Sequence, residues 1–396
     1  MRRLTVHAGV LVAVLAATTP LSAQTDSGAV QGSIYARPFI GAVGGTSIGG
    51  YLEANAHFAR EEGITDGLSM ELRRFNIFLF SSLGPRLRFI SELEFEHGTE
   101  EIALETALLD LRLSRALVLR GGILLPPIGA FNQNHDGPRW EFVDRPLVAI
   151  EIIPSTLSEV GFGVNGRLAP RGMTLTYDAY LTNGLGEGVV VNETGRTHLA
   201  SGKRAEQFGE DDNGVPAISA RVALRTRGGS ELGFSGYGTI YNTFRTEGEV
   251  VDVRRSLSIL ALDASTQLAR GITLRGEAAL AQVELPAELE EMLGARQWGF
   301  HLDVVAPFLR FARGPFEGAE LNATTRVEHV DLNVGRFSST GGLIGDDRSA
   351  ITLGLSFRPA SGTVFRANYR REWAHDLLRN AATRSGAFQF GLATYF

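Results

Sequence analysis

The chain has 396 residues, of which 38 are basic and 44 acidic, and its formal net charge is −6. A mildly acidic chain argues against nucleic acid as a partner, because phosphate backbones are bound by basic surfaces. Cysteine is absent, which excludes a disulfide framework.

Residues 1–23 have the layout of a secretory signal peptide. Two arginines precede an apolar run from Val10 to Ala17, and small residues follow. A short transmembrane anchor is the alternative, but the run is well below the ~20 residues that a spanning helix needs. We therefore expect cleavage near Ala23, with residues 24–45 as an N-terminal periplasmic lead-in segment.

From about residue 46 onward, segments of roughly 10–14 residues alternate apolar with polar or small side chains. In residues 172–183, Leu175 and Tyr177 share one face of the segment, and Thr176 and Asp178 share the other. A period of two residues indicates β-strands. Sixteen segments follow this pattern, although the first, second and fourth alternate poorly. Their expected ranges are 46–60, 68–81, 86–97, 101–113, 116–126, 158–168, 172–183, 216–226, 231–242, 256–268, 271–283, 296–308, 318–331, 348–358, 363–374 and 386–396.

Short and long connections alternate between the expected strands. Tight turns such as Ser114-Arg115 contrast with long links, which fall near 61–67, 127–157, 184–215, 243–255, 284–295, 332–347 and 375–385. Short turns on one rim and long loops on the other are typical of outer-membrane barrels. A soluble sandwich or propeller is the alternative, but no blade-length repeat occurs. We therefore predict an all-β fold: a closed 16-stranded antiparallel transmembrane barrel over residues 46–396, in which no strand edge stays unpaired.

The longest early connection, about residues 127–157, is unlike an ordinary exposed loop. With a periplasmic N-terminus it is the third outer loop, and its apolar side chains need a surface on which to pack. The inner barrel wall offers that surface, so we expect the loop to fold inward and narrow the pore. The charged residues predicted at this constriction are Arg139, Glu141, Asp144, Arg145 and Glu151.

Residues 121–168 resemble the corresponding region of the phosphate-selective porin O and P family. The segment has a glycine-rich strand that ends in a proline, a short link, Asp144-Arg145 where family members commonly have Glu-Arg, and a strand with alternating glycines. "LRRFNIFLF" at 72–80 also resembles an early strand of that family. The resemblance implies a trimeric diffusion channel in the outer membrane of a Gram-negative-type bacterium. It does not imply phosphate selectivity, because selective members line the pore with lysines and this chain has only Lys203.

Three kinds of partner follow from this prediction: outer-membrane lipid, small hydrophilic solutes or ions, and two further copies of the chain in a homotrimer. The C-terminal strand, which ends in Phe396, resembles the recognition signal for the barrel assembly machinery. That signal usually has an aromatic residue two places before the end, where this chain has Thr394.

Strand parity predicts which charged side chains line the pore. They are Arg88, Arg120, Arg167, Arg221, Arg275, Arg326, Arg366, Glu94, Asp178 and Glu277. Such residues can bias the sign of the ions that pass; alternatively, they pair across strands and only keep the lumen wet. A transporter with a specific lumen site for oligosaccharide or apolar substrate would need many inward aromatic side chains, and parity predicts few.

Signals for catalysis, cofactors and metals are weak. The letters "GTSIG" at 45–49 match G-x-S-x-G, but a nucleophile elbow needs a strand–turn–helix setting. "EDDNG" at 210–214 lacks the full EF-hand spacing. His135 and Asp136 could join a metal or acid–base site, but no second histidine lies nearby in sequence. We predict no enzymatic activity, no cofactor and no metal, and a barrel enzyme stays the remaining alternative.

Overall fold

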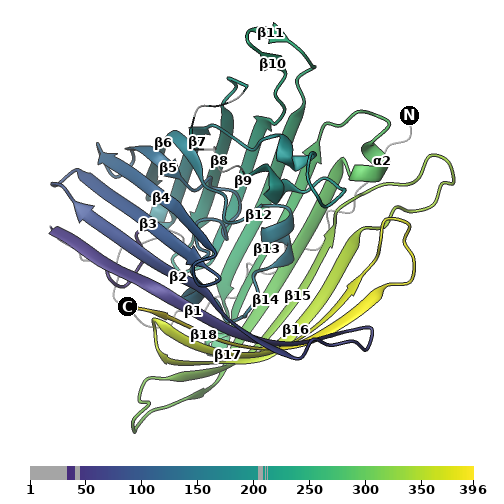
Figure 1. Cartoon of the computed structure of the whole chain (residues 1–396). Helices are drawn as coiled ribbons and strands as arrows, with labels where there is room; N and C mark the ends of the chain where they lie inside the picture. The colour runs from purple at the N-terminus through teal and green to yellow at the C-terminus, as the bar shows by residue number, and fades with distance from the viewer. Residues whose placement is uncertain (1–33, 41–44, 204–207, 210, 212) are drawn as a thin grey trace.

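The computed structural model describes residues 34–40, 45–203, 208–209, 211 and 213–396. Sixteen strands form a closed antiparallel barrel in which β18 pairs with β1 (Figure 1). The barrel strands are β1 (Gly45–Glu61), β2 (Leu68–Ser82), β3 (Leu87–Glu96), β4 (Glu101–Arg112), β5 (Val118–Leu124), β6 (Glu159–Leu168), β7 (Thr174–Thr182), β8 (Ala217–Arg225), β9 (Glu231–Ile240), β12 (Ser256–Gln267), β13 (Thr273–Val283), β14 (Arg296–Arg310), β15 (Glu320–Asp331), β16 (Asp347–Ala360), β17 (Thr363–Ala374) and β18 (Thr383–Tyr395). The predicted fold class is confirmed. The predicted signal peptide lies outside the described residues.

The connections carry the other elements. A small hairpin of β10 (Arg245–Thr246) and β11 (Glu249–Val250) projects from the rim with the long loops (Figure 1). The short helices are α1 (Leu147–Glu151) and α2 (Glu290–Leu293), with single 3-10 turns η1 (Gly137–Arg139), η2 (Pro170–Gly172), η3 (Glu187–Val189), η4 (Leu199–Gly202) and η5 (Ala269–Gly271). Within the described residues, no helix is long and apolar enough to cross a bilayer.

The outer surface of the barrel is the apolar face of the predicted strands. Phe162 is 76% exposed, Leu353 53% and Leu355 48%. On β16, Thr352 and Ser356 alternate with the exposed leucines, point inward and are buried. An apolar surface that surrounds the molecule fits contact with lipid, because an aqueous surface rarely carries one so large.

β-Bulges interrupt the alternation on β2 and β4, the two strands that flank β3. In β2, Arg74 pairs with Glu53 and Leu72 with Ala54, so Arg73 is an extra residue. In β4 the extra residue is Glu105, because the pairing passes from Thr106 directly to Leu104. A bulge lets two successive side chains point to one side of a sheet. The bulges therefore turn Arg73 and Glu105 toward the lumen beside the inward residue that follows each of them.

Candidate pore and constriction

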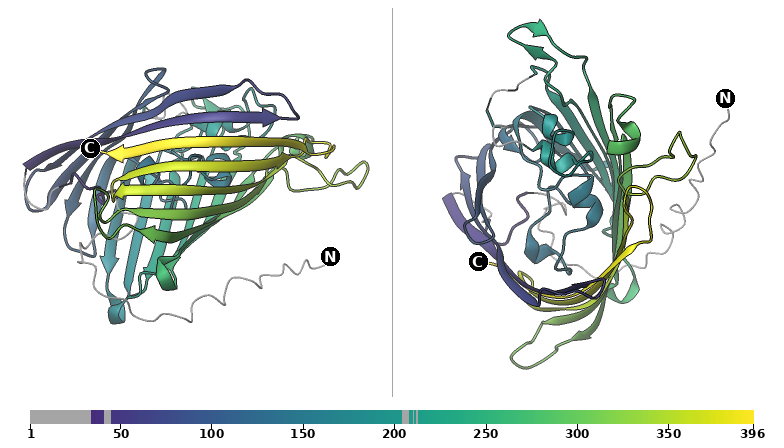
Figure 2. Two further views of the ribbon diagram at one scale, coloured as in Figure 1. Left: turned by 90° about the horizontal axis from the view of Figure 1, so that it is seen from below. Right: turned by 45° about the vertical axis from the view of Figure 1, so that its right-hand side comes forward.

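Residues 125–158, between β5 and β6, run inside the barrel and are called the inner loop below (Figure 2). Acidic and amide side chains on the wall accept its backbone N–H groups. Glu277 accepts from Ala130 and Phe131 at 2.6 and 3.1 Å, and Glu328 accepts from Leu147 at 2.8 Å. A buried irregular segment needs such partners, because an unpaired N–H group costs free energy.

Apolar contacts hold the same loop against one side of the wall. Val148, Ile152 and Ile153 of the inner loop are fully buried and join one cluster with inward side chains of β12, including Ile259. The connection between β7 and β8 contributes Leu199 to this cluster. The sequence prediction of an inward-folding loop rested on these apolar residues, and their contacts give the physical reason for its position.

The inner loop lies between two cavities. The outer cavity, at the rim with the long loops, has a volume of about 1120 Å³. Equal numbers of basic and acidic side chains line it: Arg60, Arg73, Arg74, Arg145, Lys203, Arg348 and Arg370 against Glu61, Glu94, Glu96, Glu101, Glu105, Asp144 and Glu372. The periplasmic cavity, about 1290 Å³, lies at the rim with the short turns and is lined by Arg139, Glu141, Arg275 and Arg358 among others.

The five predicted constriction residues therefore do not form one ring. Arg139 and Glu141 face the periplasmic cavity, whereas Asp144 and Arg145 face the outer one. Glu151 lies to the side, 2.7 Å from Arg348. The prediction of a single narrowest charge was wrong because the loop crosses the lumen, so residues only a few positions apart lie on its opposite sides.

Most charges of the outer cavity are neutralised by direct partners. Arg73 is 3.2 Å from Asp144, Arg74 is 2.6 Å from Glu96, and Arg370 is 2.7 Å from Glu372. Pairs of this kind keep a lumen polar without giving it a strong net field. Arg74–Glu96 joins β2 and β3, which matches the alternative, kept open from the sequence, that wall charges pair across strands. Arg73 instead pairs with the inner loop, and Arg370 with a residue of its own strand, β17.

Arg145 and Lys203 are half-buried exceptions, and the exposed Arg60 near the end of β1 is a third. Neither Arg145 nor Lys203 forms an ion pair with a carboxylate in the described part of the chain, and both donate to Thr156, Arg145 to the hydroxyl and Lys203 to the carbonyl, at 3.3 Å each. The Nε and Nη2 atoms of Arg145 are buried without a hydrogen-bond partner. Burial, followed by the like charge of Arg74, lowers the pKa of Arg145. Burial, followed by the charge of Arg145, lowers the pKa of Lys203.

The ten residues predicted to line the pore all have inward parity, and most are tied to partners. Arg326 binds Asp303 through two hydrogen bonds of 2.6 and 2.8 Å, and Arg221 binds Asp263 through two of 3.0 and 2.6 Å. Each of the other eight contacts a side chain or backbone group of the barrel wall, the inner loop or the lead-in segment. They are Arg88, Arg120, Arg167, Arg275, Arg366, Glu94, Asp178 and Glu277.

Sequence reasoning missed several lumen residues. Arg73, Arg74 and Glu105 were absent from the predicted pore lining, and the signal that could have found them was the poor alternation of the second and fourth strands. Inward aromatic side chains were also undercounted, because Tyr51 and Phe78 are fully buried inside the barrel.

The described part of the lead-in segment lies against the inner wall. Arg37 is 2.9 Å from Asp136 of the inner loop, and its guanidinium lies 4.0 Å from the centre of the Phe78 ring. Phe39 packs on the same ring at 5.3 Å between centroids. Residues 34–40 therefore occupy lumen space at the periplasmic side of the inner loop instead of standing clear of the barrel.

The letters that suggested a nucleophile elbow lie within β1. Ser47 is paired in the sheet with Phe80 of β2, and no helix follows it. The strand–turn–helix setting that the motif requires is therefore missing at this position.

No family model matches the sequence. An uncharacterised protein of Aquifex aeolicus (strain VF5) is 38% identical over 148 residues, so the match spans 36% of this chain and 33% of that relative. Among solved structures, the chain is similar to an anion-selective porin from Comamonas acidovorans, with a TM-score of 0.55, 12% identity and coverage of 89% of this chain and 100% of that one.

The outer-membrane channel DcaP of Acinetobacter baumannii is similar with a TM-score of 0.53 and 9% identity, over 89% of this chain and 97% of that one. A trimer form of Vibrio cholerae OmpT is similar with a TM-score of 0.53 and 10% identity, over 89% of this chain and 99% of that one. Identities this low show a shared fold only. Membership of the phosphate-selective porin O and P family, which residues 121–168 resemble, is not shown. The chain has the fold of outer-membrane porins.

Proposed function

We propose that this protein is an outer-membrane channel through which small hydrophilic solutes diffuse passively, and that Arg145 and Lys203 bias it toward anions such as phosphate. The signal peptide would direct export and be cleaved, and the channel would assemble as a homotrimer. The porin fold supports the channel, and the anion-selective porin among the similar structures is consistent with the bias.

The observation that carries the anion preference is that Arg145 and Lys203, both half-buried beside the inner loop, form no ion pair with a carboxylate among the described residues. Arg60, a third such cation of the outer cavity, is exposed near the end of β1. The basic and acidic side chains of the outer cavity are equal in number when Arg145 and Lys203 are counted, and these two are cations that no carboxylate of the described residues neutralises directly, so they can act on a passing anion at short range. In a narrow passage the effective dielectric is lower than in bulk water, so a fixed charge acts more strongly on a passing ion. Salt also screens less across a few Å than across the Debye length of ~10 Å at 0.1 M.

The test is the reversal potential of single channels in planar bilayers under a KCl gradient. Replacing both residues, Arg145→Gln with Lys203→Gln, should lower the chloride-to-potassium permeability ratio by about tenfold or less, the factor that ~1.4 kcal/mol represents. Arg227→Gln is the matched control, because Arg227 lies in an exposed turn and donates only to the carbonyl of Gly172.

Two outcomes would contradict the proposal at different levels. An unchanged permeability ratio in the double variant would remove the role of the two cations but leave the channel. Absence of any solute-permeable conductance in the folded wild-type protein would remove the channel itself. Inhibition of chloride current by added phosphate, in the wild type but not in the double variant, would identify phosphate as one of the anions.

A further inference from the structure

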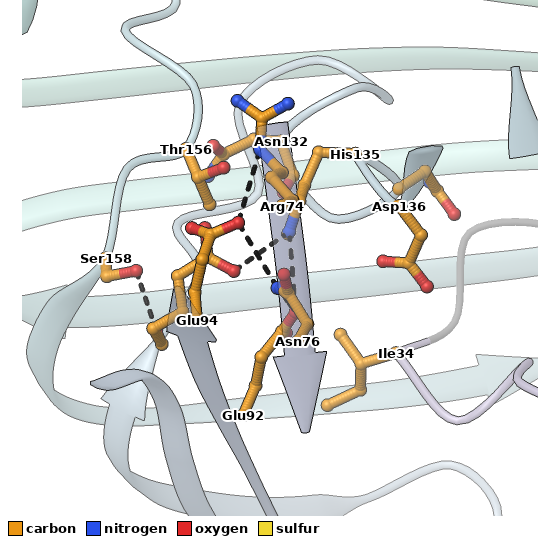
Figure 3. A network of polar contacts seen from close by, with 12 residues as sticks. Ile34, Arg74, Asn76, Glu92, Glu94, Asn132, His135, Asp136, Thr156 and Ser158 are labelled. Carbon is orange, nitrogen blue, oxygen red and sulfur yellow. Dashed lines mark hydrogen bonds and ion pairs between the residues drawn. The ribbon is translucent and has the colours of Figure 1, made fainter. Parts of the chain in front are cut away.

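Where the inner loop meets the wall, two carboxylates and one imidazole come together. Figure 3 shows Glu92 and His135 of this cluster with the neighbouring Asn76 and Glu94. Glu92 comes from β3, Glu105 from the bulge of β4 and His135 from the inner loop. One ligand atom from each lies within 4.8 Å of the other two, and all three side chains are buried. Glu105 is one of the acids that line the outer cavity, whereas Glu92 and His135 line neither cavity.

The orientation of His135 is that of a metal-binding histidine. Its Nδ1 lies 2.9 Å from the carbonyl oxygen of Asn132, which can only accept a hydrogen bond, so Nδ1 carries the proton. Nε2 then lies 3.1 Å from Glu105 Oε2 and 4.0 Å from Glu92 Oε1. Facing two carboxylates, Nε2 either carries a second proton, which makes the ring an imidazolium, or directs its lone pair at a bound cation. Metal-bound histidines commonly donate their other N–H to a carbonyl in this way.

Groups outside the cluster already hold these ligands in place. Asn132, whose carbonyl orients His135, donates to the carbonyls of Pro126 and Leu157 at 2.9 and 3.1 Å and accepts from the N–H of Leu157 at 2.8 Å. Ser158 donates to the backbone carbonyl of Glu105 at 2.7 Å. The site is therefore supported by a framework that does not depend on its occupant.

Two buried oxygen atoms beside the cluster have no partner among the described residues. The amide of Asn76 donates to Glu92 and Glu94 at 2.7 and 3.2 Å, and its own carbonyl oxygen is unpaired. The hydroxyl of Tyr51 is also unpaired, and its strongest electrostatic neighbours are Glu94 and Glu92. Both side chains are fully buried. Unsatisfied buried polar atoms are rare in native structures, and oxygen atoms of this kind are suitable metal ligands.

The fixed cations nearby are shared with other acids. Arg37 is 3.4 Å from Glu92 but makes its two shorter bonds, of 2.9 Å, to Asp136. Arg74 is 3.3 Å from Glu94 but closer to Glu53 and Glu96. Arg145 acts on Glu94 and Glu105 electrostatically but forms an ion pair with neither. The arginines therefore compensate the carboxylates of the cluster only in part, and a divalent cation between Glu92 and Glu105 would neutralise the rest.

We propose that Glu92, Glu105 and His135 bind a divalent first-row transition-metal ion, which joins β3, β4 and the inner loop. A mixed set of one imidazole and oxygen ligands suits Zn²⁺ or Mn²⁺ better than Ca²⁺ or Mg²⁺, which prefer oxygen alone. Tetrahedral Zn²⁺ with bonds of ~2.0–2.1 Å sets neighbouring ligand atoms ~3.3 Å apart. The separations of 3.1 and 4.0 Å need only small side-chain shifts to meet that value.

The test uses the full chain folded in detergent, stripped with a chelator and titrated with Zn²⁺, Mn²⁺, Ca²⁺ and Mg²⁺ by calorimetry. One Zn²⁺ ion should bind per chain, and Glu105→Gln and His135→Ala should each weaken binding by about 100-fold or more. His97→Ala is the matched control, because His97 is an exposed histidine 3.0 Å from Glu71 and represents adventitious surface binding.

X-ray absorption at the zinc edge gives a readout that does not depend on variants. The expected signature is one imidazole nitrogen with oxygen ligands at ~2.0–2.1 Å. If His135→Ala fails to fold, the affinity of Glu105→Gln for Zn²⁺ and this spectrum of the wild type test the proposed site. Wild-type protein that binds no stoichiometric metal, or binds it equally well in Glu105→Gln, would show that protons alone hold the cluster as an imidazolium–carboxylate pair, and would overturn the proposal.

Discussion

The inner wall of the barrel differs between two regions at the rim with the long loops. Along β8, β9 and β12–β15, many inward side chains are apolar, among them Tyr237, Ile259 and Val330, and they are covered by the inner loop. Along β1–β4 and β16–β18, charged side chains such as Arg74 and Arg370 face the outer cavity. The first region fixes where the loop lies, and the second determines which charges a solute meets. A charge pattern can act on solutes only if the loop opposite stays in place.

The largest expected effect comes from placing a charge in the apolar region. Val148→Asp puts a carboxylate on α1 at a fully buried position within the apolar cluster. An unpaired buried charge costs several kcal/mol, so we expect a loss of about 4 kcal/mol, relieved by release of the inner loop. Urea unfolding in lipid vesicles and single-channel conductance measure the two effects, and conductance should rise.

Val191→Asp is the control for that variant, because Val191 is 75% exposed. It should leave both stability and conductance unchanged. A Val148→Asp protein with wild-type conductance would mean that contacts with the apolar region do not hold the loop across the lumen.

The second prediction extends the comparison to the outer surface. Leu353→Arg, on the lipid side of β16, should cost roughly 2–4 kcal/mol, because a charge near the middle of the bilayer loses its hydration. Asn165→Arg points into the lumen opposite Asp178 in the sheet register, and it should be tolerated. Equal losses of refolding free energy at the two positions would contradict the assignment of inner and outer faces.

The strands could be predicted from the sequence because their signal is local. Alternation over ten residues marks a strand wherever it lies, so β17, for example, has the bounds that were predicted, 363–374. The apolar inner region was less evident, since Leu257 and Ile259 point inward while Leu260 and Leu262 point outward on the same strand, β12. A strand that is apolar on both faces needs a cover for its inward face. That cover is the inner loop, and only the whole fold shows that it lies against β12.

The candidate site depended on long-range pairing and was predicted less well. Whether Arg73 faces the lumen or the lipid depends on how β2 pairs with β1, and the bulge is set by that pairing. The partners of the loop charges come from distant strands: Arg358 binds Glu141, and Arg348 binds Glu151. Such contacts leave no periodic signal in a sequence, so the separation of Arg139 from Arg145 could not be read from their spacing.

The smallest expected effect concerns the bulge in the charged region. Deleting Arg73 keeps the pairs Arg74–Glu53 and Leu72–Ala54 in register, because Arg73 is the residue that has no partner across the sheet. The deletion removes the ion pair with Asp144, whose side chains are 21% and 29% exposed, so the loss of stability should stay below about 1 kcal/mol. The released carboxylate lies in the outer cavity beside Arg145, where it would offset the charge that attracts anions. We therefore expect the deletion variant to fold as a barrel and to show a small shift of reversal potential toward cations. Replacing Arg73 by Ala, with the bulge retained, should give the same shift. A deletion that prevents folding while Arg73→Ala does not would show that the bulge itself, through the curvature it gives β2, is needed to close the charged side of the barrel.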